Sequence, residues 1–189
     1  MTIRGALALL SLAAAFLLGT PSAHAATTDP LSFDDPGMHF RPPDGWERVP
    51  ILNKDGEAPA ADYGGPAAVW VFDRGKADQR IIEITIKRYQ GSLDELEHET
   101  ESTMRNGTDG LFIDKHELTK LENGMPAYWM RTSEGSDIGK YFRRYQYIVY
   151  DGQRSIIVAL VGHQGDFEEK DAKAALSSLY VVAYPGPRP

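Results

Sequence analysis

The second half of the chain contains four long stretches of strand-forming residues, separated by short connections. Asn123-Gly124 and Asp151-Gly152 mark two tight turns, and residues 133–139 form a longer loop. Strands joined by such short connections must lie side by side and run antiparallel. The predicted strands are Phe112–Leu121, Met125–Thr132, Lys140–Tyr150 and Ser155–Val161. The fold must therefore contain an antiparallel sheet, with the doubly apolar stretch 155–161 near its centre.

Further strands and two helices complete the predicted pattern. Arg80–Tyr89 alternates apolar and mostly polar positions, which is the period of a strand with one buried face. Ser92 and Glu95 match a capping box, so a helix is expected from Ser92 to about Asn106. A second helix, capped by Asp166, carries an apolar stripe up to Leu179. Shorter strands are expected at Met38–Phe40, Trp46–Leu52 and Ala67–Asp73, and 181–184 is a candidate to return to the sheet. These elements predict an α+β fold in which helices flank an antiparallel sheet as an α–β–α sandwich.

The first 25 residues have the order of a secretory signal peptide. Arg4 precedes an apolar stretch at 6–19, and Ala23-His24-Ala25 supplies the small-residue cleavage pattern. Cleavage after Ala25 would leave a single domain at 26–184, a Pro-rich tail at 185–189 and no membrane span. We therefore expect a periplasmic or secreted protein.

Charge and cysteine content narrow the class of protein. The 189-residue chain has a net charge of −7, with 20 basic and 27 acidic residues, so a nucleic-acid partner is not expected. Removal of the signal peptide takes away Arg4 and brings the charge to −8. The chain has no Cys, which excludes thiol catalysis, cysteine-based zinc sites and lipid attachment at a cysteine.

Several short motifs, in their order along the chain, resemble the PsbP-like family. They are the stretch from Phe40 to Trp46 with its Pro-x-Gly-Trp ending, Asn123-Gly124-Met125-Pro126-Ala127, and the aromatic strand Tyr141–Tyr150. The family's best-known members sit beside photosystem II, where they help to retain its calcium and chloride. Similar domains, such as the DcrB-like group, occur in exported bacterial proteins without known activity. The resemblance implies a non-catalytic binding or assembly module of the cell envelope, and it transfers no metal ligand to this sequence.

Aromatic and basic side chains alternate on two neighbouring predicted strands. If the strands pair in the appropriate register, one face carries five residues of the types that dominate binding surfaces: Trp129, Arg131, Tyr141, Arg143 and Tyr145. This face is the predicted binding site for a protein or small-molecule ligand of unknown identity, with the two arginines meeting a carboxylate or phosphate. In the competing interpretation these residues pack under a helix, and Glu83 neutralises the arginines.

No catalytic motif, cofactor or metal site is predicted. His98-Glu99 and His116-Glu117 begin like the zinc motif H-E-x-x-H, but each lacks the second histidine. Asp94, His98 and Glu101 fall on one side of the first helix, although a solvated acidic face explains them as well. The alternative function is an exported hydrolase or metal-dependent enzyme, whose site would assemble from His39, His116, His163 and acidic residues.

Overall fold

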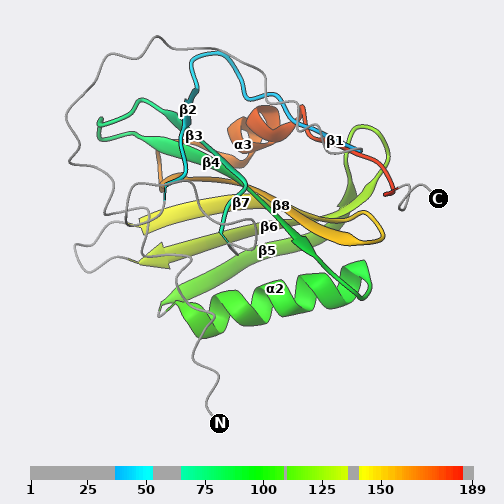
Figure 1. Ribbon diagram of the computed structural model, residues 1–189. Helices are drawn as coiled ribbons and strands as arrows, with labels where there is room; N and C mark the ends of the chain where they lie inside the picture. The colour runs from blue at the N-terminus through cyan, green and yellow to red at the C-terminus, as the bar shows by residue number, and fades with distance from the viewer. Residues whose placement is uncertain (1–36, 53–64, 109, 136–140, 185–189) are drawn as a thin grey trace.

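A computed structural model describes residues 37–52, 65–108, 110–135 and 141–184. The predicted signal peptide and the Pro-rich tail lie outside these residues. Seven strands form one antiparallel sheet in the order β2-β3-β4-β8-β7-β6-β5 (Figure 1). The strands are β2 Glu47–Val49, β3 Ala68–Phe72, β4 Arg80–Arg88, β5 Leu111–Lys120, β6 Pro126–Gly135, β7 Tyr141–Tyr150 and β8 Arg154–His163. Strand β8 is the middle strand, as its doubly apolar sequence predicted.

The two helices in the described part of the chain lie on opposite faces of this sheet (Figure 1). Helix α2 (Leu93–Gly107) begins at the predicted capping box, where the Glu95 backbone N–H donates to Ser92 Oγ and the Ser92 N–H donates to the Glu95 carboxylate. Helix α3 (Glu169–Leu176) begins later than predicted: its N-cap is Glu168 instead of Asp166. The shift occurs because Phe167, only 4% exposed, enters the core before the helix starts.

A short two-stranded ribbon shares the α3 face. Strand β1 (Met38–His39) pairs with β9 (Tyr180–Val181). The sequence had suggested that the segment 181–184 returns to the large sheet, but β9 pairs with β1 instead. Met38, Val181 and the α3 residue Leu176 are all fully buried in the same core cluster. The fold is therefore α+β as predicted, while the layer over this face combines a helix of eight residues with the ribbon.

The core is divided unequally between the two faces. On the α3 face, large side chains from β3, β4, β6, β7 and β8 form one cluster that includes Trp70, Trp129 and Tyr145. Trp46 belongs to this cluster and lies against Phe72, with 5.6 Å between ring centroids. On the α2 face, the buried apolar cluster consists of Leu96, Met130 and Ile148. None of the helices in the described part of the chain is long and apolar enough to cross a membrane.

Candidate functional site

An open groove of about 900 Å³ lies at one end of the sheet, where β5 and β7 begin and β6 and β8 end. Phe112 and Tyr141, which are 61% and 50% exposed, supply its aromatic walls. Arg143, Ser133 and Asp114 supply polar groups, and the turn at 163–166 after β8 completes the lining. Ser133 pairs with both Phe112 and Arg143 in the sheet, so these three side chains project from the same face.

A β-bulge places Asp114 in this groove. The register between β5 and β6 shifts between Ile113 and Lys115, so Asp114 has no partner residue opposite it. Its carboxylate accepts a hydrogen bond from Ser133 Oγ at 2.6 Å. Arg131 Nε lies 3.5 Å from the same carboxylate, which is an ion-pair distance. The Asp114 charge is therefore already engaged by its neighbours.

Arg143 differs from the other arginines on these strands. Arg131 lies near Asp114 and, at 3.9 Å, the Glu169 carboxylate. Arg144 projects from the opposite face and pairs with Glu83, so Glu83 does not neutralise the arginines of the predicted site. Within the described residues, Arg143 makes no ion pair, and its buried Nε has no hydrogen-bond partner. This half-buried guanidinium has unused donors at the groove wall.

The five residues of the predicted site do share a face, but the structure separates them into two environments. Arg131 pairs with Tyr145 and Ser133 with Arg143, which is the register that the prediction assumed. Trp129 and Tyr145, however, are 0% and 1% exposed. They lie beneath α3 and the segment before it, where Tyr145 contacts Phe167. Their inclusion in an exposed site was wrong, because the helix layer covers the middle of this face and leaves only its end open.

Glu169, the first residue of α3, ties that helix to the sheet. Its Oε1 accepts from Lys115 at 2.9 Å and from Trp129 Nε1 at 3.1 Å, and Lys173 lies 3.0 Å away. Burial favours the neutral acid, but the hydrogen bonds and charges of Lys115 and Lys173 outweigh it and lower the pKa of Glu169 to about 2. These contacts hold α3 over Trp129.

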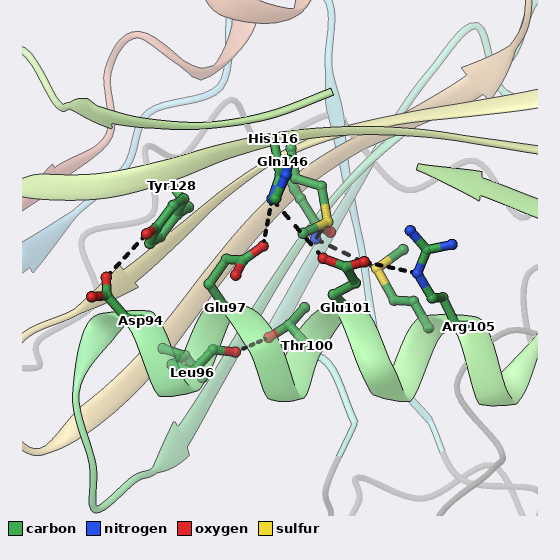
Figure 2. Close-up of polar contacts among 11 residues, drawn as sticks. Asp94, Leu96, Glu97, Thr100, Glu101, Arg105, His116, Tyr128 and Gln146 are labelled. Carbon is green, nitrogen blue, oxygen red and sulfur yellow. Dashed lines mark hydrogen bonds and ion pairs between the residues drawn. The ribbon is translucent and has the colours of Figure 1, made fainter. Parts of the chain in front are cut away.

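A second group of polar side chains lies on the other face, between α2 and the edge strand β5 (Figure 2). Glu97 and Glu101 project from α2 toward His116, and the three ligand atoms lie within 4.8 Å of one another. His116 Nδ1 is 3.0 Å from Glu97 Oε1 and 3.9 Å from Glu101 Oε2. Arg105 Nε donates to Glu101 from the far side of this cluster, at 2.8 Å. We refer to Glu97, Glu101 and His116 as the α2–β5 cluster.

This cluster differs from the set considered on sequence grounds, which was Asp94, His98 and Glu101. Asp94 instead accepts a hydrogen bond from the Tyr128 hydroxyl at 3.0 Å, and His98 is exposed. That hydrogen bond and the burial of Tyr128 raise the pKa of its phenol. The histidines proposed for a dispersed enzyme site also lie apart: His39 contacts Tyr180 in the ribbon, His116 faces α2, and His163 stacks on Phe142.

Comparison with solved structures confirms the resemblance to PsbP-like proteins at the level of the fold. The PsbP protein of the cyanobacterium Synechocystis sp. PCC 6803 matches with a TM-score of 0.53 and 15% identity, covering 77% of this chain and 86% of its own. LpqN of Mycobacterium tuberculosis, described as involved in cell envelope biogenesis, has a TM-score of 0.52 and 14% identity, covering 80% and 90%.

A Pseudomonas aeruginosa protein of unknown function, PA94, is similar to the same degree. Its TM-score is 0.53 and its identity 16%, covering 75% of this chain and 98% of its own. No family profile and no curated protein sequence matches the chain. At these identities the likeness concerns the fold alone, so the function must be argued from the residues of this chain.

Proposed function

We propose that this protein is an exported, non-catalytic module of the cell envelope that binds a partner or small ligand in the groove beside Arg143. The carrying observation is the Arg143 guanidinium, which lines a solvent-accessible groove, makes no ion pair with any described residue and has a buried Nε without a hydrogen-bond partner. Arginines that are needed only for stability are normally paired or extended into water.

The groove favours a ligand with a negatively charged group next to an apolar or aromatic part. Arg143 offers the planar donors that bind carboxylate or phosphate. Tyr141 and Phe112 offer exposed ring surface in the same lining. Asp166 is another residue of the lining and would repel a negative group, so that group is expected beside Arg143.

The comparisons support this proposal coarsely. One structural neighbour is described as a cell-envelope protein and another as a cyanobacterial PsbP, and neither description names an enzymatic activity. The predicted signal peptide agrees with a periplasmic or secreted location. Nothing in the described structure favours the alternative of an exported hydrolase, since its three histidines lie in different parts of the fold.

The test compares ligand capture by wild-type protein with capture by Arg143→Gln and Tyr141→Ala. Immobilised protein is exposed to an envelope extract, and retained molecules are identified by mass spectrometry. Arg48→Gln is the matched control, because Arg48 is exposed on β2 at the other edge of the sheet. Unfolding midpoints are measured for every variant.

We expect one set of molecules to be retained by wild-type and Arg48→Gln protein and lost with Arg143→Gln. The identified ligand should then shift the backbone NMR signals of 163–166 and of Ser133. Equal retention by all variants, or loss that follows a fall in stability, would contradict the assignment of the groove as the binding site.

A further inference from the structure

We propose that Glu97, Glu101 and His116 form a binding site for a divalent transition-metal ion, with Zn²⁺ as the best-matched ion. The site joins two residues of α2 to one of β5, on the sheet face opposite the groove (Figure 2). It is separate from the proposed ligand site and does not depend on it. Sequence patterns did not predict it, because its histidine and its carboxylates come from different elements.

The spacing of the ligand atoms suits a small metal ion. A tetrahedral zinc site with ligands at 2.0–2.2 Å separates neighbouring ligand atoms by roughly 3.3–3.6 Å. The Nδ1 atom of His116 lies 3.0 Å from Glu97 and 3.9 Å from Glu101, on either side of that value. Small side-chain rotations would therefore bring all three atoms to bonding distance. The fourth position would be taken by water, as in zinc sites with three protein ligands.

The cluster is electrostatically unfavourable without a cation. Glu97 and Glu101 are one helical turn apart on the same face of α2, so their charges repel. Glu97 is only 8% exposed, and its one partner among the described residues is the imidazole of His116. Arg105 compensates Glu101 alone. A divalent ion between the three groups would balance the charge of the Glu97 carboxylate, whose burial is otherwise costly.

The types of ligand select the class of metal. One imidazole nitrogen and two carboxylates form a mixed set that suits Zn²⁺ and its neighbours in the transition series. Ca²⁺ requires six to eight oxygen ligands and Mg²⁺ a near-ideal octahedron, which two carboxylates do not supply. The His116 side chain is 56% exposed, so an ion can reach the site from solvent.

The experiment is isothermal titration of tag-free protein with ZnCl₂, repeated with CaCl₂. The test variants are His116→Gln and Glu97→Gln. The matched controls are His98→Gln and Glu99→Gln, which change the same residue types at exposed positions on α2 outside the cluster. Circular dichroism and unfolding midpoints check that each variant is folded, and absorption of the Co²⁺-loaded protein reports the coordination geometry.

We expect one Zn²⁺ per wild-type chain, negligible Ca²⁺ binding, and a loss of about tenfold or more in zinc affinity for each test variant but neither control. Zinc binding should also raise the thermal midpoint of wild-type protein. Absence of binding at about 100 µM Zn²⁺, or unchanged affinity in folded His116→Gln protein, would overturn the proposal. If Glu97→Gln does not fold, Glu101→Gln takes its place with the same expected loss.

Discussion

The two faces of the sheet bury different kinds of side chain. The α3 face holds one large apolar cluster with tryptophan, tyrosine and isoleucine side chains. On the α2 face the buried apolar cluster has three residues, and the polar Gln146, Thr132 and Glu97 are buried beside it. Apolar burial provides most of the free energy of folding, whereas buried polar groups must be satisfied one by one. We infer that the α3 face carries most of the stability, while the α2 face can hold polar groups with another role.

Adjacent residues of β6 offer the most direct test of this contrast. Trp129 and Met130 are both 0% exposed and point to opposite faces. Trp129→Ala should lower the free energy of unfolding by about 3–5 kcal/mol, and Met130→Ala by about 2 kcal/mol, because the cluster around Met130 is smaller. Urea denaturation measures both. A larger loss for Met130→Ala would contradict the unequal division of the core.

The anchoring of α3 should depend on pH through Glu169. Because the folded-state pKa, about 2, lies below the ordinary value of 4.5, the stabilisation is complete above pH 4.5 and is lost as the pH falls toward 2. Glu169→Gln should cost about 1–2 kcal/mol at neutral pH, after allowance for solvent screening of a partly exposed carboxylate.

Denaturation midpoints between pH 2 and pH 7 provide the measurement. The control is Glu47→Gln, since that carboxylate is exposed on the edge strand β2 and belongs to neither helix. We expect the control to follow the wild-type profile. Identical pH profiles for Glu169→Gln and wild-type protein would show that the Glu169 contacts do not anchor the helix.

The α2 face should show a smaller, pairwise effect. Arg144 and Glu83 form an ion pair between β7 and β4, with side chains 17% and 26% exposed. A double-mutant cycle of Arg144→Gln and Glu83→Gln should give a coupling energy of about 1 kcal/mol. Strictly additive single-variant effects would show that this polar pair is incidental to the stability of that face.

The smallest effect on stability is expected in the groove. Arg143→Gln and Tyr141→Ala should change the free energy of unfolding by no more than about 0.5 kcal/mol, because neither side chain belongs to a buried cluster. Chemical denaturation gives these values directly. A loss above about 2 kcal/mol for Arg143→Gln would indicate an essential structural contact of that arginine.

Sequence periodicity was sufficient for most of the elements and for the antiparallel pairing of β5 to β8 with one another. The alternation in 80–89 and the turns after 122 and 150 predicted β4 to β8, and the Ser92 capping box predicted the start of α2. The start of α3 was misplaced because the burial of Phe167 is a tertiary effect. Local sequence signals predict secondary structure, but they do not predict which residues are buried by elements that are distant in the sequence.

The candidate sites were less predictable for the same reason. The shared face of Tyr141 and Arg143 followed from alternation, but the burial of Trp129 and Tyr145 depends on where α3 and the segment before it lie over the sheet. Asp114 reaches the groove through a bulge that breaks the alternation of β5. His116 contacts Glu97 because β5 packs against α2, although nineteen positions separate the two residues along the chain. For the groove, the break in the alternation of β5 near Asp114 was the one local signal that the sequence offered.

The bulge at Asp114 also has a consequence for how the chain behaves among copies of itself. Strand β5 is ten residues long and forms an edge of the sheet, so among the described residues no strand lies beside one side of its backbone. Long regular edges invite pairing with another chain, and Phe112 and Leu118 are exposed along this one. The bulge interrupts the regular spacing of N–H and C=O groups, and Lys115 and Glu117 add charge. The same irregularity that turns a carboxylate into the groove thus makes β5 a poorer template for pairing with the strand of another chain.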